Sequence, residues 1–234
     1  QEHNCYYPQR ETFIYCLPGF DYMNQKTWET IVEPEKPILF SDLEVHVTKG
    51  ESLDIGRDYP ELHQEVLQYW NGKVAEAAIV RAHDLSKALT SGDDKTVRRL
   101  MRFIGGVDSK HRLSRAILDD ERLHLALGAT DYMHFIGTNE RAINDPEFRK
   151  RLIQAGIENA ADPDKYFANP LAVCTVIYCK DPHSGEEYVP IGLRSDKVMI
   201  YPGVHHVFGG LVDVNETRTK VSLSKNVRRE LKEE

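Results

Sequence analysis

The spacing of apolar and polar residues along the chain predicts helices in its first half. Over residues 61–89 apolar side chains recur at intervals of three and four, as on one face of a single helix or of two helices broken at Gly72. A second helix is predicted to begin at Asp93 or Asp94, whose carboxylate can accept the free N–H groups of the first turn. The glycine pair at 105–106 is expected to end it, because glycine readily adopts the left-handed conformation of a helix C-cap.

Shorter patterns lie on both sides of these helices. Residues 1–60 combine prolines and aromatic residues with short β-like runs, so loops and short strands are expected there. A third helix is predicted over residues 111–118 and a fourth over 146–156, where Asp145 supplies the cap and a proline the first helical position. Between them, residues 122–139 partly alternate, which predicts a strand followed by a turn.

The second half of the chain has a β-rich pattern. Asp-Pro and Asn-Pro steps mark the change near residue 165, where we place a domain boundary. Two apolar runs, 171–179 and 188–195, are joined by a polar turn, and a third run at 198–214 precedes a charged helix that is expected to run to the end of the chain. The predicted fold class is therefore α+β, with a mixed α+β module over 1–164 and a strand, loop and helix domain over 165–234.

Composition limits the classes of partner. Among 234 residues, 30 Lys and Arg stand against 37 Asp and Glu, a net charge of −7, which argues against a nucleic-acid or basic membrane-surface protein. Charges interrupt every apolar run before the roughly 18 residues that a membrane-spanning helix needs. We therefore expect a cytoplasmic protein that binds neither membrane nor nucleic acid, and the oligomeric state is left open.

The four cysteines are too few for a disulfide scaffold. Cys174 and Cys179 lie five apart, and an odd offset on a strand directs them to opposite faces, so they are not a zinc pair. Cys5 and Cys16 could pair in an exported protein, but free thiols in a reducing compartment are the favoured interpretation.

The candidate chemistry lies in the last 28 residues. On a helix, Glu230, Glu233 and Glu234 occupy neighbouring positions of one surface, and their mutual repulsion would be relieved by a hard divalent cation. The upstream pair Gly209 and Gly210 allows the backbone to approach a ligand or an ion closely. Apolar residues every four positions form a stripe on the other face of this helix: Leu223, Val227 and Leu231.

Two other interpretations compete with a metal site. A charged tail of this kind is also typical of an ordinary solvated helix face, and the acidic residues by themselves favour that interpretation. The glycine pair, the preceding strands and an N-cap at Ser222 together favour a strand, loop and helix unit instead. His205 and His206 are adjacent on a predicted strand, so one should face the core and the other solvent rather than bind a metal together.

This unit resembles the signature of the Nudix hydrolases. The matching residues, in order, are Gly210, Glu216, Arg229, Glu230, Leu231, Glu233 and Glu234. There are two departures: twelve residues rather than seven separate Glu216 from Arg229, and the sequence stops at Glu234, before the closing glycine of the signature, so we expect a fragment of a longer protein. The resemblance implies the first part of a Nudix α/β/α sandwich with a mixed sheet, and a Mg²⁺ cofactor that Mn²⁺ could replace.

A second resemblance covers residues 120–234. The amino-acid sequence around Gly128, Thr130 and Asp131, and around 137–139, is similar to sequences of the UDP-sugar diphosphatase branch of the family. This resemblance implies a Mg²⁺-dependent pyrophosphatase for a nucleoside diphosphate sugar, plausibly cleaving UDP-glucose to UMP and glucose 1-phosphate. Another nucleoside diphosphate, such as ADP-ribose or a dinucleotide, and a non-catalytic nucleotide-sensing module are the alternatives.

The resemblance also implies residue roles. The metal ligands it implies are the carboxylates of Glu230, Glu233 and Glu234 and the carbonyl of Gly209. The catalytic residues it implies are Glu230, Glu233 and Arg229, although Arg229 is expected to brace a helix carboxylate or the glycine loop rather than to contact substrate.

The remaining residues implied by the resemblance belong to substrate binding and to the loop. Arg194 could pair with a phosphate through its planar guanidinium, or be a surface arginine on a strand. Thr138 and Asn139 could line a sugar or uridine pocket, but Gly-Thr-Asn is also typical of a plain turn, which is slightly favoured. Gly210 belongs to the substrate loop, and Glu216 is the loop glutamate of the signature.

Overall fold

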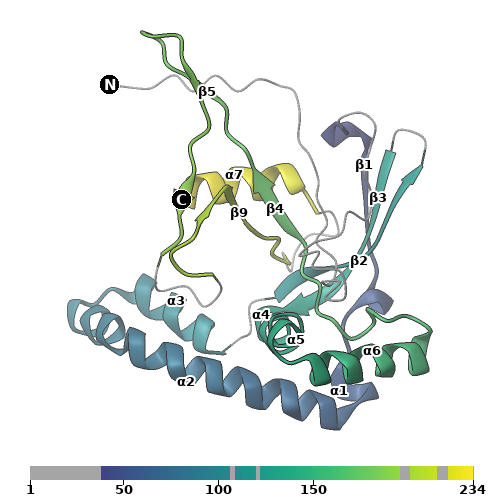
Figure 1. The fold of residues 1–234 in the computed structure, drawn as a ribbon. Helices are drawn as coiled ribbons and strands as arrows, with labels where there is room; N and C mark the ends of the chain where they lie inside the picture. Colours follow the sequence, from purple (N-terminus) through teal and green to yellow (C-terminus); the bar gives the residue numbers. More distant parts are fainter. Residues whose placement is uncertain (1–37, 106–108, 120–121, 196–200, 215–220, 234) are drawn as a thin grey trace.

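The computed structural model describes residues 38–105, 109–119, 122–195, 201–214 and 221–233. Figure 1 shows a small sheet beside a group of helices, and a strand-rich part that carries the last helix. The class is α+β, as predicted. The mixed sheet lies within residues 43–131, whereas the described strands after residue 165 form two-stranded antiparallel pairs, so the Nudix sandwich stays a prediction.

The main sheet has the strand order β1–β3–β2. Strand β1 (Leu43–Val47) pairs in parallel with β3 (Arg122–Asp131), and β3 pairs antiparallel with β2 (Ser109–Asp119). Both the short strand expected before residue 60 and the strand expected after residue 122 are confirmed.

The helix predicted over 111–118 is wrong, because these residues belong to β2. A β-bulge shifts the register between Leu113 and Arg115, so Leu113 and Ala116 both pack against the core although they lie three residues apart. A bulge inserts one residue and so changes the strict alternation of a strand. The resulting offset of three imitates the apolar spacing of a helix.

Three helices precede this sheet's hairpin in the chain: α1 (Ile55–Asp58), α2 (Pro60–Ser91) and α3 (Asp94–Gly105). Helix α2 continues through Gly72, which is exposed, so the predicted break does not occur. The start of α3 is confirmed, because the Asp93 carboxylate accepts the backbone N–H of Thr96 at 3.1 Å. Its end at Gly105 also agrees with the prediction.

The chain becomes helical again directly after β3. Helix α4 (Tyr132–Phe135) leads into a π-helical stretch, η4 (Ile136–Glu140), and then into α5 (Arg141–Asn144). The turn predicted before residue 139 is therefore wrong. The Asp131 carboxylate accepts the N–H of His134 at 2.8 Å, which caps and starts the helix at the point where the strand ends.

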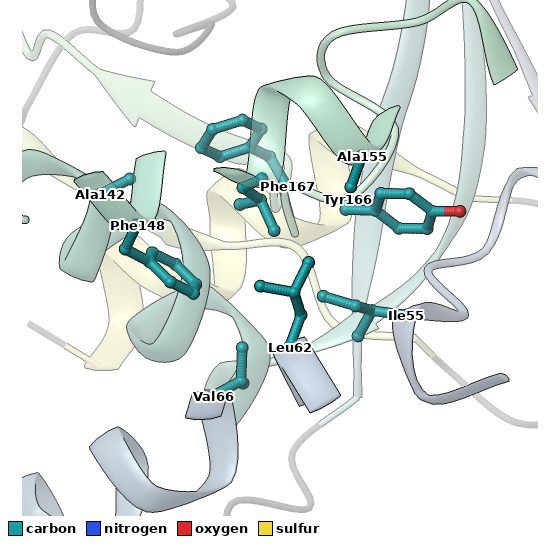
Figure 2. Close-up of a cluster of buried hydrophobic side chains, with 9 residues drawn as sticks. Ile55, Leu62, Val66, Ala142, Phe148, Ala155, Tyr166 and Phe167 are labelled. Carbon is teal, nitrogen blue, oxygen red and sulfur yellow. The ribbon is translucent and has the colours of Figure 1, made fainter. Parts of the chain in front are cut away.

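Helix α6 (Pro146–Ala160) confirms the fourth predicted helix and extends beyond the expected end at Gly156. The Asp145 carboxylate accepts the N–H of Phe148 at 3.0 Å, and Pro146 occupies the first helical position. One hydrophobic core joins these helices, as Figure 2 shows. Its buried residues come from α1, α2, α5, α6 and the segment after α6: Ile55, Leu62, Val66, Ala142, Phe148, Leu152, Ala155, Tyr166 and Phe167.

The last third of the described chain is built from short strand pairs and one helix. The pairs are β4 (Ala172–Thr175) with β9 (Phe208–Leu211), β5 (Cys179–Lys180) with β6 (Glu187–Tyr188), and β7 (Gly192–Leu193) with β8 (His205–His206). Helix α7 (Leu223–Glu233) follows. The remaining short elements are the 3₁₀ helices η2 (Phe40–Asp42) and η3 (Lys49–Glu51). The turn expected between β5 and β6 is confirmed, with Asp181 accepting the N–H groups of His183 and Ser184.

A second core joins the main sheet to the strand-rich part. Its buried residues come from both sides of the boundary predicted near residue 165: Ile38, Leu123, Leu125, Leu127, Leu171, Val212 and Leu223. The edge of β2 that does not pair with β3 forms backbone hydrogen bonds to the chain after residue 165. His111 N–H donates to Val212 O at 2.8 Å, and Leu171 N–H donates to His111 O at 2.7 Å. The boundary itself stays a prediction.

The structure also bears on the predictions from composition. No helix in the described part of the chain is long and apolar enough to cross a membrane. Cys174 is an exposed free thiol and Cys179 a buried one, but they lie on different strands, β4 and β5, so the argument from opposite faces of one strand does not apply. Cys5 and Cys16 lie outside the described residues.

Candidate functional site

The glycine pair and the acidic helix lie against each other. Gly209 and Gly210 are on β9, opposite Cys174 and Val173 of β4, and α7 packs against both strands (Figure 1). Leu223, at the start of α7, is 4% exposed in the second core, which anchors the helix to the sheet.

The predicted start and apolar stripe of α7 agree with this packing. The Ser222 hydroxyl accepts the N–H of Lys225 at 3.4 Å, as expected of an N-cap. Val227 and Leu231 are half-buried on the same side as Leu223. The expectation that the acidic residues lie on the other face is wrong for Glu230, which is seven residues after Leu223 and therefore on the side of α7 that packs against β9.

Gly210 makes room for a carboxylate. A Cβ at this position would lie 2.6 Å from Cδ of Glu230 and closer still to Oε2. The Glu230 side chain is only 13% exposed, so its carboxylate is held between α7 and the backbone of β9. This contact between Gly210 and Glu230, which a side chain at position 210 would obstruct, is the feature that defines the candidate site.

Arg229 links the helix to the strand. Its Nη2 donates to Leu211 O at 3.3 Å and also to Oε1 of Glu230, while its Nη1 donates to the carboxylate of Asp213. The expected bracing contacts of Arg229 with a helix carboxylate and with the glycine strand are therefore present. Arg229 engages Oε1 of Glu230, and Oε2 is the carboxylate atom that lies nearest to the Cβ position of Gly210.

Asp213 and Lys110 complete this charge arrangement, and sequence reasoning did not find them. Lys110 Nζ forms an ion pair with Asp213, which is also bonded to Arg229. The four side chains thus alternate in sign from Lys110 to Glu230. The available signal was the position of Asp213 just after the glycine strand, but its pairing with Lys110 depends on an isolated β-bridge between residues far apart in the sequence.

The predicted carboxylate trio is described only in part. Glu230 has the geometry given above, Glu233 is in α7 but its side chain lies outside the described residues, and so do Glu234 and Glu216. The fit of Mg²⁺ can be judged at Glu230 alone. A carboxylate is the kind of donor this ion prefers, and Glu230 is at the same time paired with Arg229. The Mg²⁺ and Mn²⁺ assignments stay predictions.

Gly209 has a different reason to be glycine. A Cβ there would lie 3.0 Å from Cα of Cys174 and closer still to the carbonyl oxygen of Val173. The absent side chain thus permits the close approach of β4 to β9. This contact does not test the prediction that the Gly209 carbonyl binds a metal.

Arg194 follows β7 and is half-buried. Its backbone N–H donates to Val204 O at 3.0 Å and its carbonyl accepts the N–H of Gly203 at 3.2 Å, which extends the β7–β8 pair. Its Nε is buried and has no hydrogen-bond partner among the described residues. In β8, His205 is exposed and His206 half-buried, consistent with opposite faces.

Thr138 and Asn139 hold the fold together through their side chains. Thr138 is fully buried, donates to His134 O at 2.7 Å and accepts the N–H of Ala168 at 3.1 Å. The Asn139 amide bonds both the side chain and the backbone N–H of Asn169. Since these polar groups are engaged inside the protein, we leave both residues out of the proposed site.

Comparisons with known proteins add no family to this geometry. No model of a protein family matches the chain, and no curated protein matches it significantly. The resemblance to the Nudix hydrolases therefore rests on the sequence motif alone. The contact between Gly210 and Glu230 is a separate observation from the structure.

Proposed function

We propose that this chain carries part of the catalytic site of a Mg²⁺-dependent Nudix-type pyrophosphatase that hydrolyses a nucleoside diphosphate sugar, with UDP-glucose as the first substrate to test. The observation that carries the proposal is the placement of the Glu230 carboxylate against the backbone of Gly210. In this chain nineteen residues separate the glycine from the glutamate, yet the two meet in space. Both glycines lie in strand β9 rather than in a turn, and the contact of this strand with the acidic helix supports one site for the two positions of the signature.

The residues of this chain would act by positioning. Arg229 holds one oxygen of Glu230 and the carbonyl of Leu211, so the carboxylate keeps a fixed orientation toward the glycine strand. Mg²⁺ bound by Glu230, Glu233 and Glu234 would neutralise the diphosphate and position the attacking water. Phosphoryl transfer depends mainly on such placement and on charge neutralisation, so a precisely held Glu230 would contribute directly to the rate.

The test measures UMP release from UDP-glucose in the presence of Mg²⁺ by the natural full-length protein. Glu230→Gln and Glu233→Gln keep the size of the side chains but remove their negative charge, and each should abolish most of the turnover. Glu186→Gln is the matched control, because Glu186 is exposed in the turn between β5 and β6. Turnover that survives both helix substitutions would exclude these residues as metal ligands.

A nucleotide-binding module without catalysis is the second candidate. It is favoured by the ion pair between Arg229 and Glu230, which already offsets the charge that a metal would otherwise neutralise. Calorimetric binding of UDP-glucose without release of UMP would support this function. Release from ADP-ribose or a dinucleotide, but not from UDP-glucose, would keep the reaction class and change the substrate.

A further inference from the structure

A separate cluster of metal-binding side chains lies on the main sheet. Within the described residues, one group of three His, Cys, Asp or Glu side chains brings its donor atoms within 4.8 Å of one another: Glu44, His46 and His124. None of these residues belongs to the Gly210 and Glu230 site, and none was selected by sequence reasoning.

The pairing of β1 with β3 creates this cluster. In the parallel register Glu44 lies opposite His124, and His46 lies two residues beyond Glu44, so all three side chains are on one face of the sheet. The alternate residues Val45, Leu123 and Leu125 point to the other face and pack in the second core. The core therefore fixes the strands that carry the three donors.

The distances approach those of a tetrahedral metal site. His124 Nδ1 lies 3.4 Å from Glu44 Oε2, and His46 Nε2 lies 3.7 Å from the same oxygen. Ligand bonds of about 2.0–2.1 Å to Zn²⁺ in a tetrahedron place neighbouring ligand atoms about 3.3–3.4 Å apart. The donor atoms of His46 and His124 lie within 4.8 Å of each other, but the two rings are parallel with their centroids 6.2 Å apart, so metal binding requires the imidazoles to rotate toward a common ion.

Arg122 orients the carboxylate of this cluster. Its Nη1 donates to Glu44 Oε1 at 3.0 Å, which leaves Oε2 directed at the two imidazoles. Carboxylate ligands of metal sites are commonly held by such an additional hydrogen bond. The second oxygen thus remains free to bind a metal while the first is held in place.

We propose that Glu44, His46 and His124 bind a divalent transition metal, with Zn²⁺ as the ion to test and water in the open fourth position. Two imidazole nitrogens and one carboxylate oxygen suit Zn²⁺, whereas Mg²⁺ prefers oxygen ligands alone. Strand β1 is at the edge of the described sheet and pairs there with β3. A metal shared by β1 and β3 would tie this edge strand to the sheet and would stabilise the folded state by linkage.

The experiment is a calorimetric titration with Zn²⁺ in buffer that contains excess Mg²⁺, so that sites made only of oxygen ligands are already occupied. The wild-type protein should bind one Zn²⁺, and the same protein loaded with Co²⁺ should show the visible absorption of tetrahedral coordination. His46→Ala and His124→Ala should each abolish this binding. His46 is 62% exposed, so its removal should leave the fold intact, which circular dichroism checks.

Two controls separate this site from the rest of the molecule. His83→Ala removes an exposed histidine on α2 and should leave Zn²⁺ binding unchanged. Glu230→Gln alters the proposed hydrolase site and should also leave it unchanged, so the two proposals can fail independently. Zn²⁺ should raise the unfolding temperature of wild type but not of His124→Ala. No Zn²⁺ binding by folded wild-type protein, or equal binding by the folded His46→Ala and His124→Ala variants, would overturn the proposal.

Discussion

Substitution of Gly210 by alanine tests whether the glycine strand and the acidic helix meet as described. The added Cβ would lie 2.6 Å from Cδ of Glu230, inside the 3.0 Å that Cβ contacts in proteins essentially never cross. The carboxylate would have to withdraw, but Arg229 holds it through Oε1. Either that ion pair breaks or the helix moves away from β9.

The expected magnitude follows from two opposing effects. Alanine in place of glycine in a strand stabilises by about 0.5–1 kcal/mol, because glycine loses more backbone freedom on folding. Overpacking of a well-filled site costs about 1–3 kcal/mol. With Glu230 present we expect a net loss of about 1 kcal/mol. In the Glu230→Ala background the space is empty, and the same substitution should stabilise the protein by about 0.5–1 kcal/mol.

Urea unfolding of the four proteins in this double-mutant cycle gives the coupling between Gly210 and Glu230. Gly209→Ala is the matched control, because its Cβ would meet the backbone of Val173 and Cys174, which the loss of the Glu230 side chain cannot relieve. Gly209→Ala should therefore destabilise equally in both backgrounds. If Gly210→Ala had the same effect with and without the Glu230 side chain, the described contact, and with it the proposed site, would be wrong.

Three further predictions concern the interactions around this site and in the helical core. A lysine at position 229 cannot form the bonds to Asp213, Leu211 and Glu230 at the same time. Arg229→Lys should therefore lower the free energy of unfolding, measured with urea, by about 1–2 kcal/mol. An unchanged free energy of unfolding would show that these pairs contribute little to stability. Thr138→Val should cost about 1–3 kcal/mol because it leaves the buried N–H of Ala168 unpaired, whereas Thr138→Ser keeps the hydroxyl and should retain most of the stability and all of the turnover. Burial, and then the nearby His134, lower the pKa of His63 from its ordinary value, so below about pH 6.5 the unfolded chain binds a proton first and the free energy of unfolding falls. His63→Gln should reduce that fall and His83→Gln should not, and an unchanged slope in His63→Gln would exclude His63 as its source.

Local sequence determined the elements that depend on near neighbours. The caps at Asp93 and Asp145 and the turn after Asp181 are formed by side chains within a few residues of the groups they bond. Strand β1 likewise follows its own short apolar alternation. These interactions need no distant partner, so a pattern of a few residues is sufficient to predict them.

Predictions from local sequence were wrong at a β-bulge and at the connection between a strand and a helix. The bulge near Leu113 gave strand β2 the apolar spacing of a helix, and this became evident only from its pairing with β3. The residues after Asp131 form a π-helical connection rather than a turn, with Thr138 bonded to the segment that follows α6. In both places long-range packing outweighed the local preference.

The same division holds for the two sites. The motif singled out Gly210, Arg229 and Glu230, but only the packing of α7 on β9 placed the Glu230 carboxylate against Gly210. Only the tertiary structure brought Lys110 to Asp213 and His124 to Glu44, since these pairs are separated by about eighty to one hundred residues and meet through strand pairing. Sequence spacing carries the geometry of one element, whereas contacts between distant elements exist only once the shared core has fixed their register.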